Sequence, residues 1–116
     1  MANKSPTKAQ VAEFEMLWPI LKSLLNETKE LSKKKADGPL NKLKVGMINK
    51  VLVRIKEILS DDPSIQFLEI LDNETLPSNS DAVFIIAQYD TAMNQFHNKH
   101  QRYDSRSSSY KWVTSD

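Results

Sequence analysis

Two histidines and an aspartate near the C-terminus come closest to a pattern that could do chemistry. His97, His100 and Asp104 stand at i, i+3 and i+7, so they would lie along one side of a helix. Helix-borne metal sites normally place histidines at i and i+4 or take ligands from other helices. His100 also continues an apolar stripe, where a hydrogen-bonded core histidine is common. We therefore predict no metal site and no cofactor.

The other reactive side chains do not form a catalytic arrangement. The chain has no cysteine, and its two glycines cannot build a phosphate-binding loop. Adjacent carboxylates such as Asp61 and Asp62 point to different sides of a helix, which excludes them as an acid/base pair. With no nucleophile beside a base, the sequence predicts a protein that is not an enzyme and has no small-molecule substrate.

Composition favours one helical domain. The 116 residues suffice for one core, and the abundance of Lys, Leu, Glu, Gln, Met and Ala with little Gly favours helix. No apolar run reaches the ~20 residues of a membrane span, so we expect no membrane association. The polar first residues and the lack of cysteine lead us to expect a cytoplasmic protein.

Charge is sharply segregated along the chain. Residues 29–56 hold nine Lys or Arg against two acids, and residues 57–90 hold eight acids and no Lys or Arg. The basic block is either a solvated helix face or a surface that neutralises phosphates or a protein partner. Because lysine outnumbers arginine, sequence-specific DNA reading is not expected. The candidate surface comprises Lys33, Lys34, Lys35, Lys42, Lys44, Lys50, Arg54 and Lys56.

Apolar residues at alternating steps of 3 and 4 predict a first helix from Thr7 to about residue 35. Phe14, Trp18 and Leu21 belong to its stripe, and Thr7 begins a capping box. Pro19 interrupts the backbone bonding, either as a kink in one helix or as the boundary between two helices. Residues 36–39 end this segment, with Gly38 suited to a left-handed cap and the following proline to the start of the next helix.

Two further helices and a short one are predicted after this break. A second helix spans about residues 40–59. One apolar stripe on it is Leu43, Met47, Val51, Ile55 and Ile58, beside a second stripe of Ile48, Leu52 and Leu59, and we place the first stripe from Met47 onward in the core. Asp62 and the proline after it open a short helix over residues 64–71. The last helix begins near residue 79 and continues to Tyr103. Its first apolar residues, 83–86, would also suit a strand, but the heptad that follows favours helix.

The predicted organisation is a disordered N-terminus at residues 1–6, a helical bundle domain at 7–104, and a Ser-rich linker with an aromatic tail at 105–116. The fold class is all-α: a small up-and-down bundle of three long helices plus one short connecting helix. The predicted core is Phe14, Trp18, Leu21, Leu25, Met47, Val51, Ile55, Ile58, Leu68, Ile86, Tyr89, Met93 and Phe96.

The predicted helices carry more apolar positions than three helices can bury against one another, and an uncovered apolar stripe is typical of an interface. Phe84, Ile85 and Trp112 are candidate protein-interface residues, with Trp112 either docked on the bundle or free to anchor a partner. We expect a non-enzymatic protein–protein interaction module, an adaptor or regulator, whose partner includes a second copy of the chain as one possibility. The alternative is non-specific nucleic-acid binding through the basic block.

Overall fold

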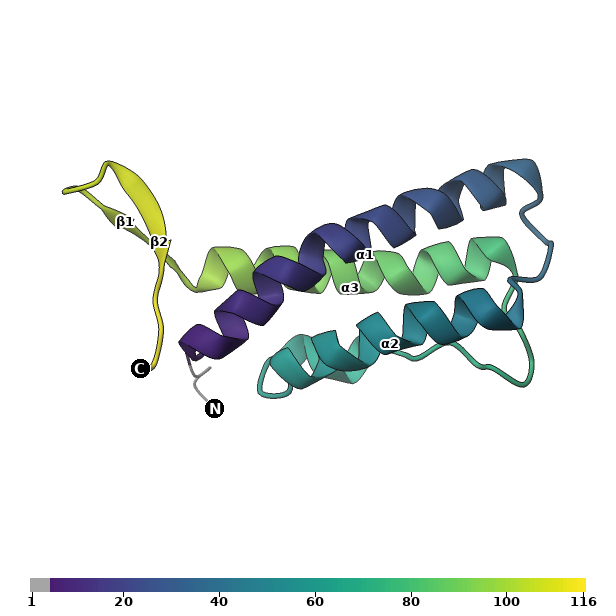
Figure 1. Cartoon of the computed structure of the whole chain (residues 1–116), viewed down its shortest axis with the longest axis horizontal. Coiled ribbons are helices and arrows are strands. Elements are labelled where there is room, and N and C mark those ends of the chain that lie inside the picture. Colours follow the sequence, from purple (N-terminus) through teal and green to yellow (C-terminus); the bar gives the residue numbers. More distant parts are fainter. Residues whose placement is uncertain (1–4) are drawn as a thin grey trace.

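A computed structural model describes residues 5–116 and shows a predominantly helical chain with three long helices. The prediction of an all-α fold is right only in part, because a small antiparallel sheet of two strands follows the last helix (Figure 1). None of the helices within residues 5–116 has the length and hydropathy to span a membrane. The elements are α1 (Lys8–Lys34), α2 (Lys42–Ile58), η1 (Pro63–Phe67), α3 (Asn79–Lys99), β1 (Gln101–Asp104) and β2 (Ser109–Trp112).

Helix α1 confirms the prediction of one helix that continues through Pro19. At its start the Thr7 hydroxyl accepts from the Gln10 backbone N–H, and the Gln10 side chain accepts from the Thr7 N–H, which is the predicted capping box. Helix α1 ends at Lys34 with Lys35 as its C-cap, and Gly38 does not take the predicted left-handed conformation. The predicted disorder at residues 1–4 lies outside the described residues, whereas Pro6 is buried.

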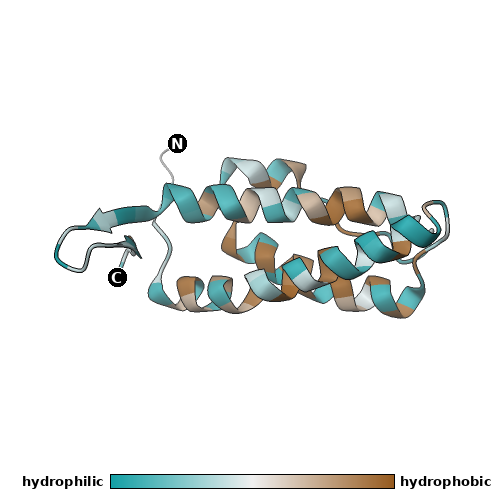
Figure 2. Cartoon of the chain, turned by 90° about the horizontal axis from the view of Figure 1, so that it is seen from above, coloured by the Kyte–Doolittle hydropathy of each residue, from teal (hydrophilic) through white to brown (hydrophobic). Residues whose placement is uncertain are grey.

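The core lies where α1, α2 and α3 meet. Each helix alternates hydrophobic and hydrophilic residues along its turns (Figure 2), and most of the hydrophobic ones face the neighbouring helices. Trp18 and Val51 are only partly buried. Ten of the thirteen predicted core residues are buried: Phe14, Leu21, Leu25, Ile55, Ile58, Leu68, Ile86, Tyr89, Met93 and Phe96.

Helix α2 presents to the core a face that only partly matches the prediction, since Ile55 and Ile58 are buried as predicted but Met47 is not. Its buried residues are Val45, Ile48, Leu52, Ile55 and Ile58, whereas Leu43 and Met47 are 73% and 55% exposed. The placement of Met47 in the core was therefore wrong. Two apolar stripes lie side by side on this helix, and packing against α1 and α3 buries only one of them. The helix starts at Lys42 after the Asn41 cap, two residues later than predicted.

Helices α2 and α3 run in the same direction, because the chain between them returns along α2 (Figure 1). Only η1, shorter than the helix predicted there, is helical between them, and the rest of residues 59–78 returns along α2. The Asn49 side chain bonds both backbone groups of Leu71, and Leu40 N–H donates to the Pro77 carbonyl. These bonds bring the start of α3 back beside the start of α2.

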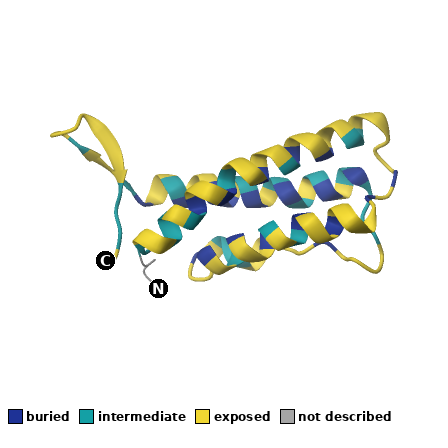
Figure 3. Cartoon of the chain, in the orientation of Figure 1, coloured by how far each residue is buried: buried dark blue, intermediate teal, exposed yellow. Residues whose placement is uncertain are grey.

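Residues 101–112 form a hairpin rather than the end of a helix and a Ser-rich linker. Helix α3 ends at Lys99, and Tyr103, predicted as its last apolar position, instead pairs with Tyr110 across the two strands. The serine-rich residues between the strands form the turn, in which Ser108 takes a positive φ of 53°. The hairpin projects beyond the helices and is mostly exposed (Figure 3).

Candidate functional site

A groove of about 400 Å³ lies between α1 and α2. Its apolar lining includes Leu24 and Leu31 on α1 and Met47 on α2, and the buried Thr28 and Ile48 lie deeper. The lining is completed by Glu27, Glu30, Leu40 and Lys44. A concave, mainly apolar surface with a few charged groups at its walls is the usual form of a binding site on a helical protein.

The groove exists because α1 and α2 diverge toward the end at which the first helix stops and the second begins (Figure 1). At the opposite end the two helices are tied together, since Arg54 Nε donates to Glu13 Oε1 at 2.7 Å. The hydrogen bond with Glu13, reinforced by its charge, raises the pKa of Arg54. Inside the groove Thr28 is buried, and its hydroxyl donates to the Leu24 carbonyl at 2.7 Å, so the helix satisfies this polar group itself.

Exposed apolar residues extend the groove along both helices. Met16 and Ile20 precede Leu24 by two turns and one turn of α1, so they continue its line, and both are exposed. On α2, Leu43 stands one turn before Met47 and is the more exposed of the two. The surface over the α1–α2 seam is therefore an apolar strip and not isolated exposed side chains.

The two walls of the groove carry opposite charges. The α1 wall provides Glu27 and Glu30, and the α2 wall provides Lys44. Glu30 pairs with Lys33 at 3.1 Å on the same helix, but both side chains are mostly exposed and such a pair contributes little. Among the described residues Lys44 makes no ion pair. The groove thus has an acidic wall facing a basic one.

The structure divides the predicted basic surface into two parts. Five lysines gather at the end where α1 stops and α2 starts (Figure 1). Farther along α2, Arg54 is engaged by Glu13, and Lys56 Nζ donates to the Leu68 carbonyl. These two cations therefore help to hold the fold together, and Lys50 is exposed beside them. The five clustered lysines are Lys33, Lys34, Lys35, Lys42 and Lys44.

The three predicted interface residues do not form one surface. Phe84, near the start of α3, is 70% exposed, whereas Ile85 is half-buried against the core. Trp112 lies beyond the opposite end of α3, where it packs edge-on against Phe14 at 5.0 Å and against His97 at 5.1 Å. Its indole N–H donates to Glu15 at 3.2 Å. The structure thus shows Trp112 docked within its own chain.

His97 and His100 lie in different environments. The His97 ring lies among Trp18, Phe14 and Trp112 as part of the aromatic cluster that holds the hairpin. Asp104 is in the sheet, where it accepts from the Arg106 N–H and pairs with Lys111. No group of three metal-ligating side chains is found within residues 5–116.

His100 caps α3 and lines a second pocket of about 460 Å³, together with Asp62 and Gln10. It is 6% exposed, and its Nε2 has no hydrogen-bond partner among residues 5–116. Burial, aided by the positive charge of Lys99, lowers the pKa of His100, although the Asp62 carboxylate opposes this shift. The imidazole is therefore neutral near pH 7.

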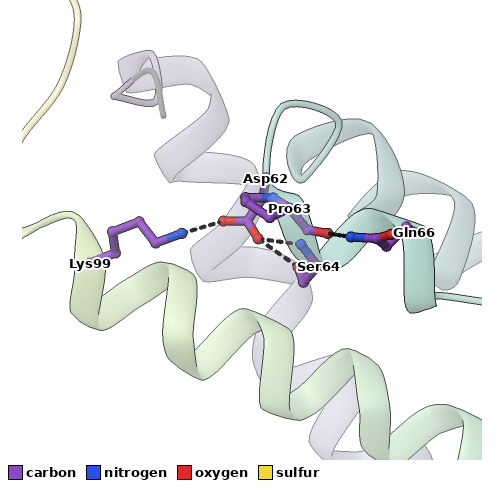
Figure 4. Close-up of polar contacts among 5 residues, drawn as sticks. All are labelled: Asp62, Pro63, Ser64, Gln66 and Lys99. Carbon is purple, nitrogen blue, oxygen red and sulfur yellow. Dashed lines mark hydrogen bonds and ion pairs between the residues drawn. The ribbon is translucent and has the colours of Figure 1, made fainter. Parts of the chain in front are cut away.

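Asp62 joins the turn after α2 to the end of α3 (Figure 4). Its carboxylate accepts from the Ser64 N–H at 2.9 Å and the Ser64 hydroxyl at 2.6 Å, and from Lys99 Nζ at 2.9 Å. Burial alone would raise the pKa of Asp62, but the hydrogen bonds from Ser64 and Lys99 outweigh it and hold the pKa below its usual value. This confirms the predicted cap before Pro63.

The chain matches no protein-family model, no curated protein and no solved structure. Sequence reasoning named Lys44 but assigned Met47 to the core, and it did not identify the groove residues on α1. The available signal was the excess of apolar positions on α2, which indicates an uncovered stripe without saying which one it is.

Proposed function

We propose that the chain is a non-enzymatic protein–protein interaction module that binds an amphipathic helix in the α1–α2 groove. The observation that carries this proposal is the uncovered apolar stripe of α2, Leu43 and Met47, beside a groove lined by Leu24 and Leu31. Two diverging helices with apolar walls are suited to a third helix laid between them.

The energetics favour a protein partner for this surface. Covering an exposed Leu or Met side chain is worth about 1.5–3 kcal/mol when burial is complete. Leu43 and Met47 together with the half-buried Leu24 and Leu31 could supply several kcal/mol, which is the scale of a hot spot in an interface. The opposite charges on the two walls would set the orientation of the bound helix more than its affinity.

Because the natural chain has no cysteine, one introduced cysteine would carry a unique crosslinker. We would place it at Leu43, at the groove, or at Asn94, an exposed polar position on α3. In cells that normally express the chain, the groove position should give a protein adduct that Met47→Glu abolishes, and the Asn94 position should give none. Equal adducts at both positions, or adducts insensitive to Met47→Glu, would contradict the proposal.

A second candidate function is salt-sensitive binding of nucleic acid at the lysine cluster. Its supporting observation is that five lysines from α1, the turn and α2 gather at one end, and only Lys33 has an ion-pair partner among the described residues. Each phosphate contact should contribute a slope of about −0.9 in the logarithm of affinity against that of salt on duplex DNA. A labelled duplex that fails to bind at about 50 mM salt would exclude this function.

A further inference from the structure

We propose that the helix bound in the α1–α2 groove carries a cluster of aspartate or glutamate residues at one end, and that this acidic end lies against the lysines where α1 stops and α2 starts. This inference rests on the proposed docking function and specifies the chemistry of its partner. It is carried by the place of these lysines relative to the apolar strip, and by the positions of the acids around them.

Two of the five clustered lysines stand directly at the groove. Lys44 lines it, and Lys34 follows Leu31 by three residues, so Lys34 lies on the same side of α1 as the groove. Both lysine side chains are exposed, and neither makes an ion pair among the described residues. The other three lysines lie at the same end and add to the positive potential there.

The acids around this end leave it positive. Asp37 lies in the turn after α1 and Asp81 in the first turn of α3, so these two carboxylates stand against five lysines. Two more acids, within residues 72–74, belong to the return segment, which Asn49 holds. Because Asn49 follows Met47 by two residues, it lies on the opposite side of α2 from the groove. The return segment therefore does not bring its acids to the groove.

The glutamates on the α1 wall do not cancel the lysines at the end. Glu27 stands seven residues before Lys34, which is about 10 Å along the helix axis. Glu30 is nearer, but it already pairs with Lys33 on its own helix. A partner helix with acids at one end would therefore meet lysines there. A basic residue about two turns farther along the same partner would meet Glu27.

The apolar strip favours a helix over nucleic acid as the molecule that meets these lysines. From Met16 to Leu31 the strip on α1 is about 22 Å long, which is the length of four helical turns. Leu43 stands between two of the lysines in the sequence and is 73% exposed. Phosphates would neutralise the lysines but leave Leu43 in water. An amphipathic helix with an acidic end covers both.

The test begins with peptides selected without a charge bias. A display library of helices of about 18 residues would fix leucines at i, i+3, i+4 and i+7 and leave the other positions free to be Asp, Glu, Lys, Gln or Ser. Selection on the whole chain should enrich helices with acids clustered in the turn at one end. Selected helices without such clustering would overturn the inference and leave the docking function intact. Recovery of no helix at all would contradict both.

Two matched double variants locate the acidic end. Lys34→Glu with Lys44→Glu reverses the two lysines at the groove. Lys29→Glu with Lys42→Glu makes the same change of charge on the same two helices, but each of these positions precedes a groove residue by two and faces away from it. All four lysines are exposed, so circular dichroism should show unchanged helix content in both variants.

Fluorescence anisotropy of a selected peptide at about 150 mM salt gives the readout. The groove variant should raise the dissociation constant about tenfold, and the control variant less than about threefold. Equal losses in the two variants, or no loss in the groove variant, would overturn the inference. A DNA duplex that displaces the selected peptide from the natural chain at this salt would assign the lysines to nucleic acid and would overturn it as well.

Discussion

Replacing Asp62 by alanine should destabilise the chain far more than the same change one residue earlier. The Asp62 carboxylate is nearly buried, caps η1 through Ser64 and binds Lys99 at the end of α3. Asp61 is exposed and makes no side-chain hydrogen bond among the described residues, which makes it a matched control. The comparison therefore isolates the junction between the return segment and α3.

The expected cost follows from the contacts that are lost. A capping side chain contributes about 1 kcal/mol. The charge-assisted bond with Lys99 adds about 1 kcal/mol after allowance for its partly exposed ammonium, and the Ser64 hydroxyl loses a further bond. We expect about 2.5 kcal/mol in total for Asp62→Ala. A chain of 116 residues unfolds with an entropy of about 0.24 kcal/mol per kelvin, so the midpoint temperature should fall by about 10 °C.

Urea unfolding followed by circular dichroism at pH 7 measures this difference. Asp61→Ala should stay within about 0.5 kcal/mol of the natural chain. Because the folded pKa of Asp62 lies below its unfolded value, its contribution is present above about pH 4 and disappears as the pH falls through the folded pKa. The two variants should therefore converge in acid. Equal losses for Asp61→Ala and Asp62→Ala at pH 7 would refute the reasoning.

Two further outcomes concern residues near the C-terminal end of α3. Trp112→Ala removes the contacts with Phe14 and His97 that hold the hairpin on the helices. Because an isolated hairpin is marginal in water, residues 101–112 should lose amide-exchange protection while the helices keep theirs. A uniform loss of protection in all elements would contradict this prediction. His100 has a lowered folded pKa, so the unfolded chain binds more protons as the pH falls below about 6.5, and stability should decrease from pH 7 to pH 5. His100→Phe should flatten that dependence in urea unfolding, and an unchanged slope would show that another group causes it.

The sequence predicted best those features whose cause is local. The Thr7 cap, the continuous α1 and the Asp62 cap each depend on residues within one or two turns, and each is confirmed. Spacing across Pro19 was informative because the stripe keeps its phase only if the helix continues. The existence of three long helices follows from the same short-range periodicity.

Features decided by distant contacts were not predictable in the same way. The direction of α3 depends on bonds such as Asn49 to Leu71, which join residues 22 positions apart. The hairpin depends on Trp112 reaching Phe14 across nearly the whole chain. Tyr103 fits a helical stripe as well as a cross-strand pair, so spacing alone could not distinguish them.

Helix α2 shows why the groove itself was beyond sequence reasoning. Its two stripes, one through Leu43 and Met47 and the other through Ile48 and Leu52, are both apolar enough to face a core, and only the packing of α1 and α3 decides between them. The sequence therefore predicts that a stripe remains uncovered but not which one. A helix that only supported its own fold would lose nothing by carrying polar residues on the uncovered side. The presence of Leu43 and Met47 on that side, beside one acidic and one basic wall, is the basis of the proposal that another molecule covers this surface.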